Sequence, residues 1–418
     1  MNKTLATTGL ILLATAGPAL ASGYRIPEQS LNSTARAGSY VAYTPSADAA
    51  YYNPANMSWL ENRWTLEADA TWIHLSSIDY TDVVASQSGD SENENFFMPT
   101  LFAVSPEYNN FRFGFSVTAP GGLSKQWDDS YPRRYAEEFT LKVFDINPTV
   151  SYKFNDRFSI GVGVQAVYSD GKVKNNALLN ANPLISLTRD MTGDSWDLGY
   201  NLAATLKPMD KMNLSITYRS KVDLTVEGDA ALHYTNNTIP ATVNWDGYAE
   251  VEIPLPAVLA VAASYTFFDQ LTVELEYDRT YWSDYKNLDF NYASNFGVGN
   301  PFNAYDAVVS KNWKDSNAWR LSLTYDMKNN FILMAGFAMD ENPIPDSTLG
   351  FELPDSDALL YSLGVRYKIN ENMEMGVAYL YDDKESRTVD NIAAGGKVNG
   401  TFDAAAAHLV TFGFTYKM

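Results

Sequence analysis

The amino-acid sequence predicts an all-β protein, a transmembrane antiparallel β-barrel of about fourteen strands with an N-terminal plug (hatch) in its lumen. Three observations support this prediction. Apolar residues alternate with polar or small ones over many segments, short polar turns alternate with long connections, and a short apolar leader precedes them. Strands of an outer-membrane barrel show alternate residues to lipid and to the lumen, and their turns are short on one side and long on the other.

The leader occupies residues 1–21. Lys3 precedes an apolar run from Leu5 to Ala16, which Pro18 and the small residues around Ala21 terminate. This order is typical of a secretory signal peptide, and the run is too short to span a membrane as a helix. We therefore expect the mature chain to start near Ser22.

Composition excludes several classes of protein. The 418 residues contain no cysteine, so a disulfide scaffold is excluded. After the leader no stretch of about 18 apolar residues occurs, which excludes a helical membrane protein. Hydrophobic residues make up 46% of the chain, yet the mean hydropathy is only −0.24, so they are plentiful but dispersed. The net charge of −20 argues against a nucleic-acid partner, whose phosphates require Lys and Arg.

The predicted barrel covers residues 61–418. Residues at i, i+2 and i+4 share one face of a strand, so a segment with one apolar and one polar face is predicted to be a barrel strand. The clearest examples are Phe158 to Tyr168, Trp319 to Met327, Tyr361 to Ile369 and Met373 to Tyr381. Counting such segments gives about fourteen strands.

The connections between these segments predict the topology. Short polar turns are expected in the periplasm and long loops outside the cell. The short ones are Asn155-Asp156, Lys328-Asn329-Asn330 and Asn370-Glu371-Asn372, and the long ones are Ser86 to Asn95, Asn175 to Gly193 and Tyr292 to Asn312. Aromatic residues near strand ends, namely Trp64, Trp72 and Tyr281-Trp282, are expected to form interfacial girdles.

Residues 22–60 lack the alternation and are rich in Ala, Ser and Asn. A segment of this kind ahead of a barrel either hangs in the periplasm or folds into the lumen. Its apolar residues favour burial in the lumen as a plug, and they are Tyr24, Ile26, Leu31, Val41, Tyr51, Met57 and Trp59.

Motifs spaced along almost the whole mature chain resemble, in order, those of the FadL/TodX family of outer-membrane transporters for long-chain fatty acids and aromatic hydrocarbons. They are Ser22 to Ser30, Asn53-Pro54-Ala55, Ser116 to Leu123, Arg134-Tyr135, Gly193 to Asn201, Tyr218 to Val222, Asp340 to Pro345 and Leu353 to Asp357. The resemblance implies uptake of a hydrophobic small molecule through a plugged barrel in the outer membrane of a Gram-negative-type bacterium. Fatty acids and aromatic hydrocarbons both remain open as its substrates.

The segment Ala119-Pro120-Gly121-Gly122 interrupts a predicted strand. Proline lacks the N–H that a ladder needs, and glycine has little strand propensity. One interpretation is an ordinary loop, because Pro-Gly often marks a turn. The other is an inward kink that leaves a gap in the wall, which is costly because unpaired backbone groups would face lipid. The resemblance implies the kink, with the ligand leaving through it sideways into the membrane, and we favour that interpretation.

Two further elements are expected to support gating. Asn53-Pro54-Ala55 forms a simple turn on one interpretation, whereas the resemblance implies that it fixes the hatch against the wall. Pro54 fixes its own φ and biases Asn53 away from helix. The free end of the plug, with Ser22, Gly23 and Tyr24, is expected to move, because a free end is displaced at low cost.

The resemblance implies that basic residues in the barrel interior can hold the carboxylate of a fatty ligand. The resemblance places one basic position near Lys311 and Lys314, without choosing between them. A second matching position is Asn175, with Lys172 and Lys174 close by in the sequence. A carboxylate clamp is thus expected only in part.

Catalysis, cofactors and metals are not expected. His74, His233 and His408 show no spacing typical of a metal site and are interpreted as loop or lumen residues. No Gly-x-Ser-x-Gly motif occurs, which argues against an outer-membrane hydrolase. A general diffusion porin would have an open polar lumen, and the plug and the Pro-Gly-Gly interruption argue against it.

The expected partners, apart from the transported molecule, are outer-membrane lipid and lipopolysaccharide, and the chain is expected to be a monomer. Lys125, Arg133 and Arg134 could bind lipopolysaccharide phosphates or an incoming carboxylate. The resemblance also implies contact with the barrel-assembly machinery, which recognises an aromatic last residue. Here the alternation of Phe412, Phe414 and Tyr416 ends on Met418.

Overall fold

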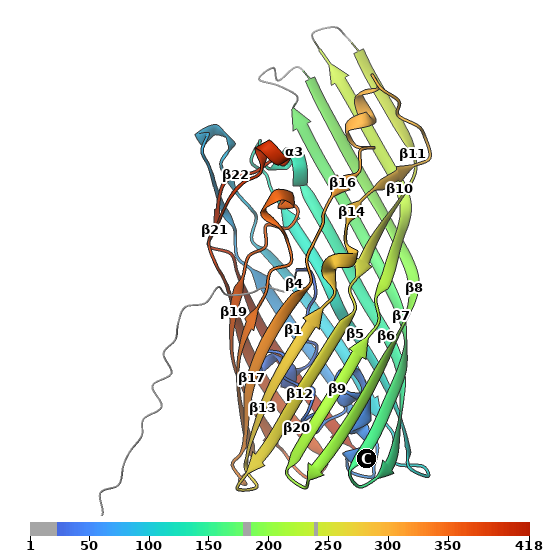
Figure 1. The fold of residues 1–418 in the computed structure, drawn as a ribbon, viewed down its shortest axis with the longest axis vertical. Coiled ribbons are helices and arrows are strands. Elements are labelled where there is room, and N and C mark those ends of the chain that lie inside the picture. The colour runs from blue at the N-terminus through green and yellow to red at the C-terminus, as the bar shows by residue number, and fades with distance from the viewer. Residues whose placement is uncertain (1–22, 179–184, 238–240) are drawn as a thin grey trace, which may run out of the picture.

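The computed structural model describes residues 23–178, 185–237 and 241–418. The proposed leader, residues 1–21, and Ser22 lie outside this part of the chain. The fold is a tall antiparallel barrel with the N-terminal residues inside its lower half (Figure 1). No helix within the described ranges is long and apolar enough to cross a membrane.

The barrel has fourteen strands, as the sequence predicts. Three of them consist of two successive segments, β9 with β10, β11 with β12, and β13 with β15. All neighbours are antiparallel, and β1 pairs with both β4 and β23, which closes the sheet. The segments are β1 (Thr65–Leu75), β4 (Glu94–Val104), β5 (Phe111–Gln126), β6 (Glu138–Asn155), β7 (Phe158–Leu178), β8 (Ile185–Met209), β9 (Met212–Arg219), β10 (Val222–Asn236), β11 (Ala241–Leu255), β12 (Val258–Phe267), β13 (Leu271–Thr280), β15 (Phe290–Tyr292), β17 (Ser316–Asp326), β18 (Phe331–Asp340), β19 (Ala358–Lys368), β20 (Met373–Lys384) and β23 (Ala406–Lys417).

Smaller elements complete the fold. A four-stranded sheet of β2 (Asp79–Asp82), β3 (Gly89–Asp90), β21 (Arg387–Asp390) and β22 (Asn399–Asp403), and a pair of β14 (Asn287–Leu288) with β16 (Val309–Ser310), lie in the connections. The helical turns are α1 (Leu31–Thr34), α2 (Ala49–Tyr52), η1 (Pro54–Trp59), η2 (Ala85–Gln87), α3 (Arg133–Ala136), η3 (Trp282–Asp284), η4 (Pro301–Ala304), η5 (Asp346–Thr348) and η6 (Ile392–Ala394).

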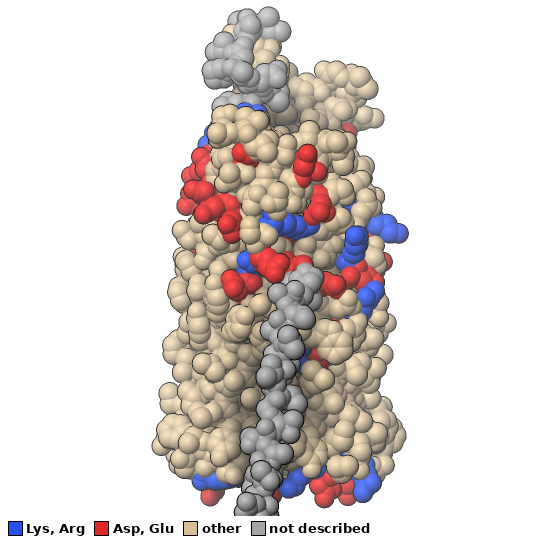
Figure 2. All heavy atoms as spheres, turned by 60° about the vertical axis from the view of Figure 1, so that its left-hand side comes forward, with Lys and Arg blue, Asp and Glu red and all other residues tan. Residues whose placement is uncertain are grey.

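The alternation sorts the side chains between the two faces of the wall. Large apolar residues such as Leu198, Leu363 and Phe412 are exposed on the outside, whereas Glu274 and Arg320 are buried inside. Charged residues gather in the upper part and at the bottom rim, and a broad uncharged belt separates them (Figure 2). An apolar outer band is the surface that lipid requires.

The prediction of a loop from Asn175 to Gly193 is wrong. The β7–β8 ladder continues through Asn175↔Arg189 to Leu178↔Ser186, so both strands extend far beyond the apolar belt. Backbone hydrogen bonds hold a ladder together without apolar side chains, and a strand outside the membrane has no lipid face to cover. The loss of the apolar pattern therefore marks the end of the belt and not the end of the strands.

Two expectations about aromatic and histidine residues need correction. Trp64 and Trp72 are exposed, but Trp282 is fully buried and belongs to no girdle. His74 and His408, interpreted as separate loop or lumen residues, lie on β1 and β23 in direct register, with ring centroids 5.9 Å apart. Closure of the barrel brings the first strand beside the last.

The topology can be tested with epitope tags. A tag at residues 297–299, where the glycines have open space around them, should be labelled on intact cells, because long loops of an outer-membrane barrel are expected outside the cell. A tag in the Asn370–Asn372 turn should be labelled only after the outer membrane is permeabilised. Equal labelling of both tags on intact cells would contradict the predicted orientation.

Candidate functional site

The wall of the barrel is interrupted between β4 and β5. Their ladder runs from Val104↔Gly114 to Leu101↔Val117 and ends there, although β4 continues to pair with β1 as far as Glu94. Above the interruption, the amide of Glu92 donates to the carbonyl of Gln126 at 2.9 Å. The opening is thus bounded below and above by hydrogen bonds.

The segment Ala119 to Gly122 lies at this opening and remains part of β5. Its register with β6 shifts between Thr118 and Gly121, which bends the strand. Ala119, Pro120 and Gly121 are buried. The segment is therefore a kink in a continuous strand, and not a loop between two strands.

The N-terminal segment, residues 23–60, takes the place of β4 as the neighbour of the kink. Arg25 pairs with Gly121, the amide of Ile26 donates to the carbonyl of Pro120 at 2.9 Å, and the amide of Gly122 donates to the carbonyl of Tyr24 at 2.9 Å. The Gln29 side chain accepts from the amide of Ala119 at 2.7 Å and donates to its carbonyl at 2.9 Å. Backbone groups that the gap would leave unpaired are thereby satisfied from inside.

A cavity of about 340 Å³ lies behind the opening. Most of its lining is apolar and comes from the N-terminal segment, the kink and the strands on both sides of the gap, including Ile26, Met98, Leu123, Leu141, Val143 and Leu360. Phe97 and Phe144 also line it, and both are exposed on the outer surface of the wall. The cavity therefore reaches the lipid-facing surface through the gap.

One end of this cavity is acidic. Glu28, Asp340, Asp355 and Asp382 line it together with Lys384, whose ammonium lies 2.6 Å from Asp355 Oδ1. The amide of Gly23 donates to Asp355 Oδ2 at 3.1 Å, so this end also holds the start of the N-terminal segment.

Aromatic side chains surround the free end of the N-terminal segment. The Tyr24 ring contacts Trp282 at 4.6 Å and Trp313 at 5.7 Å between centroids, and its hydroxyl donates to the carbonyl of Pro254. Gly23 has a φ of +65°, and a Cβ there would lie 2.9 Å from Trp282. Only glycine fits this backbone conformation and this space without strain.

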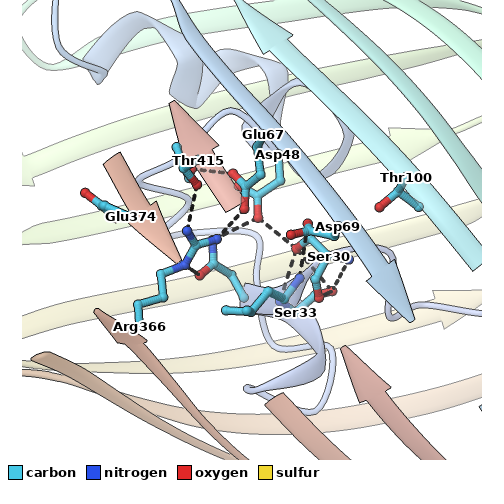
Figure 3. Close-up of polar contacts among 12 residues, drawn as sticks. Ser30, Ser33, Asp48, Glu67, Asp69, Thr100, Arg366, Glu374 and Thr415 are labelled. Atoms are coloured by element: carbon cyan, nitrogen blue, oxygen red, sulfur yellow. Dashed lines mark hydrogen bonds and ion pairs between the residues drawn. The ribbon is translucent and has the colours of Figure 1, made fainter. Parts of the chain in front are cut away.

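Buried charges fasten the middle of the N-terminal segment to the wall. Arg366 of β19 forms an ion pair with Glu67 of β1 and donates to Asn32 Oδ1 at 2.7 Å (Figure 3). Asp48 accepts from Ser30 and from Tyr40 at 2.7 and 2.8 Å. These groups connect two strands to residues 30–48.

A second group of buried charges lies on the neighbouring part of the wall, on β13, β17 and β18. Arg320 of β17 pairs with Asp278 and Asp340 at 3.2 and 2.8 Å and donates to the carbonyl of Ala37 at 3.0 Å. Glu274 of β13 accepts from the amides of Val41, Ala42 and Tyr43, and it pairs with Arg36 at 2.6 Å. A wall carboxylate thus satisfies three successive amides of the N-terminal segment.

Asn53-Pro54-Ala55 lies against β7 and β8. Asn53 Nδ2 donates to Thr205 Oγ1 at 3.0 Å, and Ser159 Oγ donates to the carbonyl of Ala55 at 2.9 Å. A Cβ on Gly161 would lie 2.5 Å from the Ala55 amide, so the glycine permits this close approach. The motif starts η1, with Pro54 at its first position, where a missing N–H costs nothing.

Lys311, Lys314 and Asn175 do not line the cavity behind the gap, whereas Lys125 does and is buried there beside Glu94. Lys311 is buried and forms an ion pair with Glu352, whereas Lys314 is exposed. Asn175 Oδ1 accepts from Arg189 Nε at 2.8 Å across the β7–β8 ladder. The sequence reasoning missed Arg189 because cross-strand register is not visible in a single strand's pattern.

The geometry defines a class of protein: a closed outer-membrane barrel whose lumen is occupied by its own N-terminal segment and whose wall opens to lipid at one kinked strand. The chain matches the family model of outer membrane protein transport proteins (OMPP1/FadL/TodX) over residues 12–418, and it belongs to that family. The family consists of transporters and not of enzymes, and its members lie in the outer membrane of Gram-negative bacteria.

Individual relatives and solved structures agree with this assignment. The chain is 25% identical to outer membrane protein P1 of Haemophilus influenzae, over 91% of this chain and 89% of the relative. It is 26% identical to a long-chain fatty acid transport protein of Escherichia coli, over 94% and 95%. In structure it resembles a Pseudomonas aeruginosa FadL homologue, with a TM-score of 0.79 and 18% identity over 94% of this chain and 99% of that one. It also resembles the Ralstonia pickettii toluene transporter TbuX, with a TM-score of 0.70 and 18% identity over 93% of this chain and 97% of that one.

Removing the Arg366 charge should loosen the N-terminal segment. In Arg366→Gln the buried carboxylate of Glu67 loses its cation, and breaking a buried pair in this way costs about 3–5 kcal/mol. We expect a lower midpoint of thermal unfolding and a higher ion conductance in planar bilayers. The control is Lys211→Gln, which breaks an exposed pair with Asp269 and should change neither quantity. Unchanged stability and conductance in Arg366→Gln would contradict the fastening role.

Proposed function

We propose that this protein carries hydrophobic small molecules inward across the outer membrane, with long-chain fatty acids or aromatic hydrocarbons as the substrate class, and releases them sideways through the gap between β4 and β5. The observation that carries this proposal is the apolar cavity behind the gap, which opens to the lipid-facing surface. The names of its relatives, one for long-chain fatty acids and one for toluene, agree with such a substrate class.

Capture of the ligand needs only apolar surface. Above the N-terminal segment the lumen is lined by Phe139, Val173, Met191, Val226, Val251, Ile253 and Phe290, around a small cavity of about 30 Å³. Burial of apolar area contributes about 25 cal/mol per Å². The larger cavity of about 340 Å³ lies within the range of roughly 300–1,000 Å³ that is usual for small-molecule pockets.

Release depends on a change at the free end of the hatch, for which we propose residues 22–60. The start of the segment is held at the kink by backbone hydrogen bonds, at the acidic end of the cavity by one bond from Gly23, and by a partly exposed ion pair of Arg25 with Asp278 at 3.4 Å. The middle is held by the fully buried ion pair of Arg36 with Glu274 at 2.6 Å and by hydrogen bonds from Arg366 and Arg320. Gly23, Tyr24 and Arg25 are therefore the moving element, and Asn53-Pro54-Ala55 is the fixed base.

The N-terminal segment also argues against a general diffusion porin. Buried residues fill it almost throughout, from Glu28 to Ser58. Its side chains bond to opposite sides of the wall, Asn53 to Thr205 on β8 and Asn32 to Arg366 on β19. An open polar channel is incompatible with such filling, since a diffusion pore requires a continuous aqueous path.

Straightening the kink should block release while capture is preserved. The variant Pro120→Thr/Gly121→Val/Gly122→Thr restores an N–H and strand propensity, so β5 can pair with β4 and close the gap. We expect a folded protein that binds oleate but does not support oleate uptake in cells lacking other transporters. The matched control is Gly171→Val in β7, where the wall is paired on both sides, and it should transport normally. Normal uptake by the folded kink variant would contradict lateral release.

Locking the free end to the kink should also block transport, reversibly. Arg25 and Gly121 form a pair flanked by the Ile26–Pro120 and Tyr24–Gly122 hydrogen bonds, an arrangement with Cα atoms about 4.5 Å apart, close enough for a disulfide. The chain has no native cysteine, so Arg25→Cys/Gly121→Cys gives one possible disulfide. Uptake should be lost under oxidising conditions and recover with a reductant, whereas each single variant should be insensitive to both. Equal uptake by the oxidised and reduced protein would show that the free end need not move.

A further inference from the structure

A buried ion pair lies among the connections above the apolar lumen. Lys311 follows β16, and Glu352 lies between η5 and β19. The side chain of Lys311 is 4% exposed and that of Glu352 is 21% exposed. Glu352 is thus the more accessible member of the pair.

A second cation stands beside this pair. Arg189 is 8% exposed, and its guanidinium lies over the rings of Phe290 and Tyr305 at 4.3 and 4.9 Å. None of the ion pairs among residues 23–178, 185–237 and 241–418 involves Arg189. Burial by itself would raise the pKa of Glu352, but the Lys311 ammonium, and more weakly the Arg189 guanidinium, hold that pKa below its usual range. Glu352 is therefore ionised and faces two positive charges.

The two cations lie at the edge of the apolar lumen. Phe290, which contacts the Arg189 guanidinium, lines the small cavity together with Met191 and Val251. The Tyr292 hydroxyl, 3.4 Å from Arg189 Nη1, is also 3.4 Å from the Met191 sulfur. An amphiphile with its apolar part in this part of the lumen would bring its head group towards the cations.

We propose that Glu352 is an internal counter-ion in a head-group site formed by Lys311 and Arg189, and that it sets the preference between anionic and neutral apolar ligands. This inference rests on the proposed function. An anionic amphiphile can pair with Lys311 and Arg189 only after it displaces Glu352, whereas a neutral ligand leaves the Lys311–Glu352 ion pair intact. Glu352 itself is needed when no ligand is bound, because a buried ammonium without a partner is costly.

Displacement is feasible because the Glu352 side chain is the more exposed member of the pair and belongs to the connection between β18 and β19. Once displaced, it regains hydration, which offsets part of the lost ion pair. Competition between two carboxylates for the same cations predicts that the chain discriminates weakly between a fatty acid and its ester, and that removing Glu352 makes the discrimination strong.

The test compares oleate with methyl oleate by isothermal titration calorimetry on the purified full-length protein. In Glu352→Gln, oleate should bind about ten- to a hundredfold more tightly, the range expected for a hydrogen bond to a charged group, while methyl oleate should bind as before. The double variant Glu352→Gln/Lys311→Met keeps the net charge of the wild type and removes both charges of the ion pair. In it the increase in oleate affinity should disappear. The matched control is Asp346→Asn, an exposed carboxylate that pairs with Arg387, and its oleate affinity should equal that of the wild type.

Two outcomes separate this inference from the proposed function. In the first outcome, the wild type and all variants bind both lipids, but the ratio of oleate to methyl oleate affinity is the same in the wild type and in Glu352→Gln. This outcome would overturn the counter-ion role and leave the proposed function standing. The same holds if Asp346→Asn gains as much as Glu352→Gln, because the effect would then come from overall charge. If neither lipid binds to any of the chains, the proposed function fails, and the inference fails with it.

Discussion

The backbone hydrogen bonds between residues 24–26 and residues 120–122 are the interaction on which the rest of the structure depends. A wall that opens to lipid exposes unpaired N–H and C=O groups, each costing several kcal/mol where no water is available. Here the strand that bends away from β4 is paired from inside by the chain's own N-terminus. The same hydrogen bonds therefore shape the opening and stabilise it, so a movement of the N-terminus also changes the wall.

The two parts of the N-terminal segment are held with different strength. Residues 28–58 are fixed by the buried ion pair of Arg36 with Glu274, by hydrogen bonds from the buried cations Arg366 and Arg320, and by the contacts of Asn53-Pro54-Ala55 with the wall. Buried charges lose much of their favourable energy when one partner is withdrawn, so this part resists displacement. Residues 23–26 depend on a few hydrogen bonds, on one partly exposed ion pair of Arg25 with Asp278, and on aromatic contacts of Tyr24, which can be exchanged for contacts with an apolar ligand.

Polarity divides the lumen into zones. The lower part contains the N-terminal segment with the carboxylates around it, and the upper part is apolar. Near the connections Lys311 pairs with Glu352, and Arg189 beside them is in no ion pair among the described residues. At the cavity behind the gap Lys384 pairs with Asp355 and Lys125 with Glu94. An anionic ligand would therefore compete with a carboxylate of the chain for each of these three lysines.

The sequence by itself determined the barrel and its count of about fourteen strands, because alternation with period two is a local property of the chain. Pro120 and Gly121 marked an irregular position in one strand but left a loop and a kink as alternatives, and the resemblance to the family favoured the kink. Prediction from the sequence was wrong where the same local pattern can arise from two different structures. The polar stretch from Asn175 to Gly193 was predicted as a loop but continues the ladder outside the membrane, and Trp282 faces inward because the chain turns into the lumen at η3. Only the tertiary structure decided which distant residues meet: Tyr24 with the kink, Asn175 with Arg189, Lys311 with Glu352, His74 with His408. These pairings follow from register and from closure of the sheet, and both arise from contacts between strands that no single strand encodes.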